Sequence, residues 1–247
     1  MTPAWVTAFL DLAPGNFEDG VRFWAALTGY DVSPPRGESD QFATLVPRDG
    51  DAYLRVQRIE EGDDRVHLDL HVPDPGAAAA RAVGHGATVV ADRGDYVVLR
   101  SPGGLAFCFV THRAEVRPRP TTWSGGHSSL LDQVCIDIPA SSYDRECDFW
   151  RDLSGWEMRS SPVSEFRSLV RPQGQPIRLL LQRLEDETGE VRAHLDWATT
   201  DRAAETERHL ALGARVLDPR PGWTVLADPT GRRYCITDRD PETGVLG

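Results

Sequence analysis

The chain has 247 residues, and its 27 basic residues, all arginine, face 38 acidic residues, so the net charge is −11. An acidic surface argues against a nucleic-acid backbone or an anionic membrane as the main partner, because both require a basic surface. Without lysine, the chain can form neither a Schiff base through lysine nor the lysine contact of a phosphate-binding loop.

Sequence landmarks recur at a distance of 126 or 127 residues, which indicates an internal duplication. Phe23 recurs as Phe149, 126 residues later, and His67 recurs as His194, 127 residues later. The matching segments are Phe23-Trp24 and Phe149-Trp150, Gly29-Tyr30 and Gly155-Trp156, His67-Leu68-Asp69 and His194-Leu195-Asp196, and Phe107-Cys108-Phe109 and Tyr234-Cys235-Ile236. We therefore predict a first domain at residues 1–113 (copy one) and a second at 130–247 (copy two). A Pro- and Gly-rich linker at 114–129 joins them.

Each copy opens with the same predicted elements. A strand at residues 6–12 or 134–138 leads through a polar turn into an amphipathic helix at 17–28 or 143–154. Gly29 or Gly155 ends that helix. Two strands follow, at 41–47 and 53–59 in copy one and at 166–171 and 177–184 in copy two.

The second half of each copy repeats this pattern. It begins with a strand at residues 66–72 or 193–198, followed by an alanine-rich helix at 76–84 or 202–212. In copy one, strands at 96–99 and 105–111 close the pattern, joined through a Ser-Pro-x-Gly turn that returns as Asp-Pro-x-Gly in copy two. Each copy is therefore two cycles of a strand, a helix and further strands.

This order of elements, with Phe-Trp in the first helix, His-Leu-Asp on a later strand and a closing Asp-Pro-Thr-Gly motif, resembles the vicinal-oxygen-chelate superfamily. Within it, the chain is similar to tandem glyoxalase-like or bleomycin-resistance-like domains. The resemblance implies an α+β fold of two tandem domains, each made of two βαβββ modules that form a cupped mixed sheet. It implies a lyase, an isomerase or a secondary-metabolism enzyme with a degenerate metal site. The alternatives are a non-catalytic protein that sequesters a drug or metabolite, and a scaffold without activity.

The resemblance also implies four converging metal-ligand positions in each copy. They are Gln133, Gln182, His194 and Cys235 in copy two, and Thr7, Gln57, His67 and Cys108 in copy one. None of these residues is a carboxylate, although oxygen-rich sites for magnesium, manganese or iron normally contain one. We therefore expect no bound metal; if a divalent metal is present, we expect it in copy two.

His194 and His67 are the strongest catalytic candidates. Strand alternation places them on one face with Asp196 and Asp69, which can orient the imidazole for acid–base chemistry. A structural hydrogen-bond network is the alternative interpretation. His71 continues that face in copy one and is expected at the rim.

The other predicted ligand-binding residues share strands with apolar neighbours. Gln57 and Gln182 suit a polar cleft, because a half-buried amide needs hydrogen-bond partners. Cys108 and Cys235 are either ligand contacts or small core residues, and Tyr96 and Trp223 are either aromatic walls or core. The full predicted set is Gln133, Gln182, Asp196, Cys235, Trp223, Gln57, Asp69, Cys108 and Tyr96.

The expected partner is a small-molecule substrate or ligand, with no nucleic acid and no membrane. No apolar run approaches the roughly 20 residues of a membrane span, and no charged-then-apolar leader opens the chain. We therefore expect a cytoplasmic protein with reduced cysteines. The two copies are expected to pair as an intramolecular pseudo-dimer, and further oligomerisation stays open.

Overall fold

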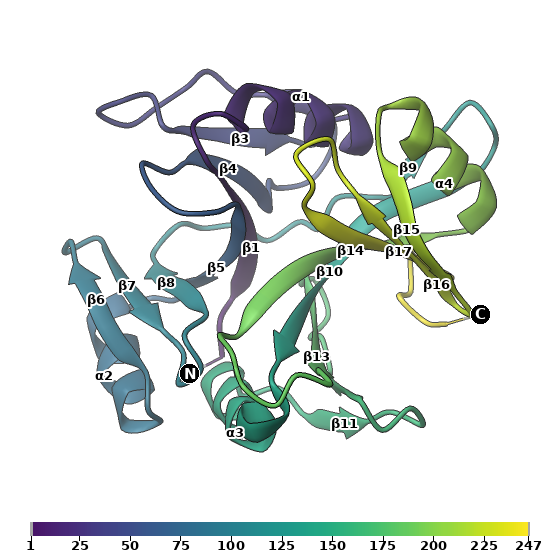
Figure 1. Ribbon diagram of the computed structural model, residues 1–247. Coiled ribbons are helices and arrows are strands. Elements are labelled where there is room, and N and C mark those ends of the chain that lie inside the picture. Colours follow the sequence, from purple (N-terminus) through teal and green to yellow (C-terminus); the bar gives the residue numbers. More distant parts are fainter. Residues whose placement is uncertain (1, 247) are drawn as a thin grey trace. The chain divides into compact units, whose positions relative to one another are not determined.

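The computed structural model describes residues 2–246 (Figure 1). Copy one contains β1 (Trp5–Leu12), α1 (Phe17–Thr28), β2 (Asp31–Val32), β3 (Phe42–Val46), β4 (Leu54–Arg58), β5 (Arg65–His71), α2 (Pro75–Gly84), β6 (Thr88–Asp92), β7 (Tyr96–Arg100) and β8 (Ala106–Val110). The linker holds β9 (Thr121–Thr122). Copy two contains β10 (Ser128–Ile138), the short 3-10 turn η1 (Ala140–Ser142), α3 (Tyr143–Ser154), β11 (Met158–Ser160), β12 (Phe166–Leu169), β13 (Arg178–Arg183), β14 (Arg192–Thr199), α4 (Arg202–Ala211), β15 (Arg215–Arg220), β16 (Trp223–Ala227) and β17 (Arg233–Thr237).

The strands form two sheets whose orders correspond element by element. One runs β2-β3-β4-β1-β5-β8-β7-β6, and the other runs β11-β12-β13-β10-β14-β17-β16-β15 with β9 added beside β10. Both sheets are mixed, because β5 pairs with β8 and β14 with β17 in parallel while the hairpins are antiparallel. The predicted α+β class with repeated βαβββ modules is confirmed.

Sequence patterns missed the outermost strands of both sheets, which are β2 and β6 in copy one and β11 and β15 in copy two. β2 and β11 are only two and three residues long. β6 and β15 are exposed on both faces, so their residues do not alternate between apolar and polar. Edge strands of this kind carry no periodic signal. Among the described residues, no helix is long and apolar enough to cross a bilayer.

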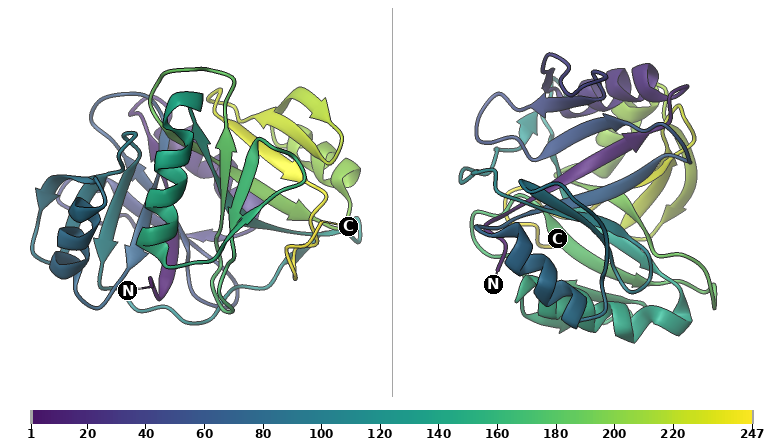
Figure 2. Two further views of the ribbon diagram at one scale, coloured as in Figure 1. Left: turned by 90° about the horizontal axis from the view of Figure 1, so that it is seen from below. Right: turned by 90° about the vertical axis from the view of Figure 1, so that its left-hand side faces the viewer.

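The chain divides into two compact units, and each contains segments of both copies. Unit one holds the N-terminal segment up to Phe9, Val66–Val116 and Val134–Ala193. Unit two holds Leu10–Arg65, Arg117–Gln133 and the C-terminal segment from His194. Within unit one, α3 of copy two lies beside β8 of copy one (Figure 2), where Phe107 packs on Trp150 with ring centroids 5.5 Å apart. The division into domains 1–113 and 130–247 follows the repeat and stays a prediction.

The helix ends follow their sequence signals. Gly29 and Gly155 close α1 and α3 with φ of 69° and 67°, in the left-handed region that favours glycine. Asp74 and Asp201 cap the starts of α2 and α4. Their side chains accept hydrogen bonds from the backbone amide of the third residue of each helix, Ala77 or Ala204. The same caps in both copies place the helices at equivalent points of the repeat.

Each of the two longer helices buries a tryptophan whose indole N–H meets a carboxylate. In unit two, Trp24 Nε1 donates to Asp228 Oδ2 at 3.1 Å. In unit one, Trp150 Nε1 donates to Glu146 Oε2 at 2.9 Å, one turn earlier on α3. Ser101 aligns with Asp228 in the repeat, so the carboxylate has changed place between turn and helix. Each unit therefore keeps one carboxylate for its buried indole, because an unpaired buried N–H costs free energy.

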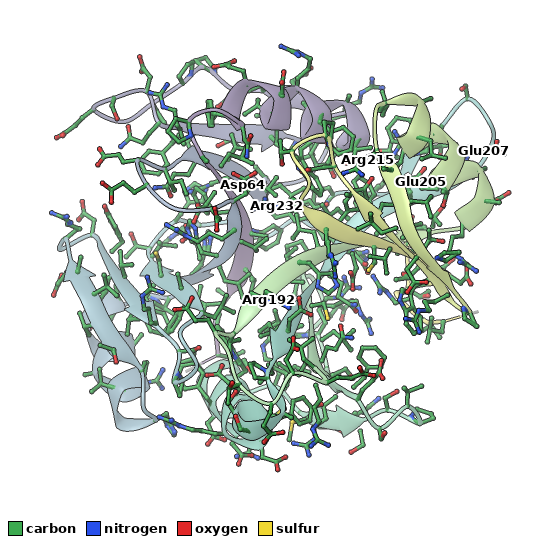
Figure 3. The ribbon with its side chains drawn as sticks, viewed as in Figure 1. Asp64, Arg192, Glu205, Glu207, Arg215 and Arg232 are labelled. Atoms are coloured by element: carbon green, nitrogen blue, oxygen red, sulfur yellow. The ribbon has the colours of Figure 1, made fainter. Side chains whose placement is uncertain are left out.

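Helix α4 buries a polar network around Glu205, which is labelled in Figure 3. Glu205 Oε1 lies 2.8 Å from Arg208 Nη2 and 3.0 Å from His209 Nε2, and Oε2 lies 2.7 Å from His127 Nε2. Burial opposes ionisation, but hydrogen bonds from Arg208 and His209 hold the pKa of Glu205 well below its usual range. Burial lowers the pKa of His209. The carboxylate therefore pairs with Arg208 and accepts from neutral His209.

The linker joins this network through Trp123. The guanidinium carbon of Arg208 lies 3.6 Å from the centroid of the Trp123 ring, and Arg208 Nη2 donates to Leu27 O at 2.9 Å. Cation–π contact of this kind adds to the ion pair with Glu205. Arg208 thus ties α4, the end of α1 and the linker together within unit two.

Candidate metal centres

In each copy, two parallel strands bring a histidine, an aspartate and a cysteine together. His194 and Asp196 alternate along β14, so their side chains lie on one face of the strand. β17 runs parallel to β14 in the register that sets Cys235 opposite Asp196. β5 and β8 repeat this register and set Cys108 opposite Asp69. The duplication therefore carries both the residues and the strand register that gathers them.

The second site consists of Gln133, His194, Asp196 and Cys235, all in unit two. His194 Nε2 lies 3.2 Å from Asp196 Oδ1 and 3.7 Å from Cys235 Sγ. Gln133 Nε2 donates to Asp196 Oδ2 at 2.6 Å. One donor atom each from His194, Asp196 and Cys235 lies within 4.8 Å of the other two. This spacing brings an imidazole, a carboxylate and a thiol within reach of one bound ion.

Asp196 is held as a carboxylate although it is buried. Burial alone would raise its pKa, but the adjacent His194, together with Arg239 and Gln133, lowers the pKa of Asp196 below its usual range. Arg239 is itself buried and paired with Asp132. Asp196 therefore stays ionised at neutral pH. A buried negative charge beside an imidazole and a thiol favours a bound cation.

The first site consists of His67, Asp69 and Cys108, all buried and all in unit one. Their donor atoms also lie within 4.8 Å of one another, and His67 Nε2 lies 3.6 Å from Asp69 Oδ1. Phe9 of β1 stacks on the His67 ring, with centroids 4.5 Å apart and an interplanar angle of 12°. The first site thus has the same three donors and an aromatic ring on its imidazole.

The expectation that His71 lies at the rim is wrong, because its exposed fraction is 1%. His71 Nδ1 lies 2.7 Å from His112 O, and a carbonyl only accepts, so Nδ1 carries the proton. His71 Nε2 then accepts from the Thr7 hydroxyl at 2.9 Å. Each ring nitrogen of this buried imidazole therefore makes a hydrogen bond. The Thr7 hydroxyl is therefore committed to His71 rather than presented to a metal.

The predicted glutamines of the module-closing strands lie on β4 and β13. Gln57 is half-buried and pairs across the sheet with Phe42. Gln182 is also half-buried, pairs with Phe166, and accepts a hydrogen bond from Cys135 Sγ at 3.5 Å within unit one. Their contact with a ligand stays a prediction.

The predicted aromatic walls lie on the cysteine face of their sheets. Cross-strand partners share a face, and Val98 pairs with Cys108 while Val225 pairs with Cys235. Tyr96 and Trp223 lie two residues before these valines and so on the same face. Tyr96 is exposed and Trp223 is half-buried. The register agrees with a wall position, and contact with a ligand stays a prediction.

The donor set at the second site fits a thiophilic divalent metal. Imidazole nitrogen, thiolate sulfur and carboxylate oxygen are the three ligand types of zinc, and three protein ligands leave a coordination position open for chemistry. The ligand positions implied by the resemblance lacked an anionic oxygen, and Asp196 supplies it. The signal was present in the sequence as His-x-Asp, but sequence reasoning assigned Asp196 only to orienting or ligand-binding roles.

Comparison with protein families now places the chain. A model described as the glyoxalase-like domain matches residues 8–110 and 133–237. The chain belongs to the glyoxalase-like domain family. The resemblance to tandem vicinal-oxygen-chelate domains is thereby confirmed. No curated protein matches this glyoxalase-like chain significantly.

Solved structures share the fold of this glyoxalase-like protein at low identity. A substituted variant of 4-hydroxymandelate synthase from Streptomyces coelicolor is 16% identical over 99% of this chain and 94% of that chain, with a TM-score of 0.65. An extradiol ring-cleaving dioxygenase from B. fuscum is 16% identical over 97% and 72%, with a TM-score of 0.65. The Mn(II)-bound glyoxalase from Novosphingobium aromaticivorans is 14% identical over 99% and 85%, with a TM-score of 0.62. At such identities they establish the fold alone.

Gln133 is expected to act on a bound metal through Asp196. The Gln133→Leu variant removes the amide that holds Asp196 Oδ2, so the affinity for zinc should fall about 10- to 100-fold, as for other residues that support metal ligands. Competition with a chromophoric chelator measures this. Gln57→Leu, which removes a half-buried glutamine from a strand of copy one, is the control and should leave the affinity unchanged. Equal affinities for Gln133→Leu and wild type would contradict the assignment.

Proposed function

We propose that the protein is a metal-dependent enzyme of the lyase or isomerase type that acts on a small molecule at the second site. The cluster of His194, Asp196 and Cys235, with its ionised buried carboxylate, is the observation that supports it. A bound divalent metal supplies Lewis-acid polarisation of substrate oxygens. The glyoxalase-like family and the Mn(II)-bound glyoxalase of similar fold agree with this type of chemistry.

In the second site, three residues would hold the ion, and two others act on Asp196. His194, Asp196 and Cys235 would hold the metal through nitrogen, oxygen and sulfur. Gln133 fixes one oxygen of Asp196 and leaves Oδ1 on the His194 side. Arg239 offsets part of the negative charge of Asp196. The substrate would take the open position that three protein ligands leave.

The thiol ligand favours Lewis-acid chemistry over reactions that use molecular oxygen. Thiolate selects zinc and related soft metals, whereas the iron and manganese sites of oxygen-dependent enzymes rely on histidine and carboxylate. A thiolate beside activated oxygen would also be exposed to irreversible oxidation. We therefore assign the protein to lyase or isomerase chemistry rather than to the ring cleavage of the dioxygenases that share its fold.

Metal analysis of untagged protein tests the proposal. We expect about one zinc or cobalt ion per chain, a thiolate-to-cobalt charge-transfer band in the cobalt form, and a lower Tm after chelation. Linkage predicts about 4 kcal/mol of stabilisation at a metal concentration of 1,000 times Kd. Metal-free protein whose Tm rises only with small aromatic or keto-acid ligands would instead indicate sequestration. No response to metal or ligands would overturn both.

A further inference from the structure

We propose that only the second site binds the metal, and that Phe9 and Thr7 of β1 disable the first. This inference rests on the proposed function, because it concerns which of the two equivalent clusters carries it. The two sites share histidine, aspartate and cysteine in the same register. They differ in the first strand of each copy, and that difference decides the outcome.

The first difference is the residue that supports the aspartate. In copy two, Gln133 of β10 donates to Asp196 and holds the carboxylate for the ion. The aligned residue in copy one is Thr7, whose hydroxyl is committed to His71. Thr7 cannot replace the glutamine, because its short side chain already uses its one proton in a buried hydrogen bond. Among the described residues, no side chain of the first strand is seen to donate to Asp69 as Gln133 donates to Asp196.

The second difference is the side chain two residues further along the strand. Phe9 of β1 aligns with Cys135 of β10. The Phe9 ring stacks on the His67 imidazole and is itself buried. A metal with an open position requires room for water or substrate, and an aromatic ring offers no ligand atom. A divalent ion at the first site would have its three protein donors but no water on the side where the Phe9 ring lies.

The geometry of the cluster agrees with this difference. His67 Nε2 lies 3.6 Å from Asp69 Oδ1, whereas His194 Nε2 lies 3.2 Å from Asp196 Oδ1. Both histidines lie beside their aspartate, and only the His67 ring has an aromatic ring of the first strand, Phe9, stacked on it. The first cluster is therefore a packed structural copy of the second.

Grafting the first strand of copy two onto copy one tests the inference. The Thr7→Gln/Phe9→Cys variant should bind about two zinc ions per chain, measured by elemental analysis after equilibrium dialysis, where the wild type binds about one. Adding His67→Ala to the graft should return the count to one. A graft that folds and still binds one ion would overturn the roles of Thr7 and Phe9.

Single variants keep the test decisive if the graft does not fold. In the wild-type background, His67→Ala should leave one zinc ion bound. A wild type with two ions, one of them lost in His67→Ala, would overturn the inference and leave the proposed function intact. A wild type without metal would overturn the proposed function, and with it the difference between the sites.

Discussion

The His194→Ala variant is expected to lose zinc affinity by more than the roughly 100-fold that marks loss of a supporting residue. His194 supplies the nitrogen donor of the second site, and Asp196 and Cys235 alone leave two protein ligands. Asp196 keeps Gln133 and Arg239 as partners, so the free energy of unfolding should fall by only about 1–2 kcal/mol. Isothermal titration with zinc and urea denaturation of metal-free protein measure the two effects.

His67→Ala is the matched control, because it removes the aligned histidine of copy one. It should leave the zinc affinity of the chain unchanged. Equal loss in both variants would show that both clusters bind metal, whereas no loss in either would remove His194 from the site. Collapse of the fold in His194→Ala without a separable effect on zinc would make the residue structural.

Glu205→Ala is expected to produce the largest loss of stability, about 3–5 kcal/mol, the usual cost of leaving one partner of a buried ion pair. In the variant, the buried imidazoles of His209 and His127 would lose the carboxylate oxygens that they contact. Arg208 would lose its ion pair. Urea denaturation of the metal-free chain gives the change. A loss below about 1 kcal/mol, the value of an exposed pair, would contradict the assignment.

The chain provides its own control for this prediction. Ala78 and Ala82 of α2 align with Glu205 and His209, and both alanines are buried. Glu205→Ala/His209→Ala therefore copies the packing of α2 and removes a stranded imidazole. It should lose no more stability than Glu205→Ala, because removing the buried His209 Nε2–H compensates for the Tyr234 hydroxyl, which loses its hydrogen bond to His209 Nδ1. A double variant less stable than the single one would contradict this account.

The same network gives stability a pH dependence of defined sign. The lowered pKa of His209 contributes stability that is complete above its ordinary value of 6.5 and declines as the pH falls below it. The lowered pKa of Glu205 contributes above 4.5 and declines at still lower pH. From about pH 7 to pH 5, the wild type should therefore lose more unfolding free energy than Glu205→Ala/His209→Ala. Parallel curves would contradict the role of His209.

The duplication has kept some features of each copy and reassigned others. Both copies retain the His-x-Asp strand and its cysteine, and both retain one carboxylate for the buried indole. The buried network of α4 has alanines in its place on α2. Each compact unit contains segments of both copies, so residues of one copy pack against residues of the other within a unit.

The sequence by itself determined the repeat, the α+β class and the histidine–aspartate face. These depend on local rules: α1 and α3 occupy the predicted residues 17–28 and 143–154, because apolar spacing and a terminal glycine define a helix within a dozen residues. Alternation along β14 placed His194 beside Asp196 for the same reason.

Only the tertiary structure shows which of these residues lie together. The parallel register of β14 and β17 sets Cys235 against Asp196, although 39 residues separate them in the chain. Gln133 reaches Asp196, and Phe9 covers His67, across similar distances in sequence. Local periodicity carries no information on the register between distant strands, which packing of the whole unit sets. The sequence thus predicted the histidine, aspartate and cysteine of both copies, and the structure adds the contacts of Gln133 with Asp196 and of Phe9 with His67.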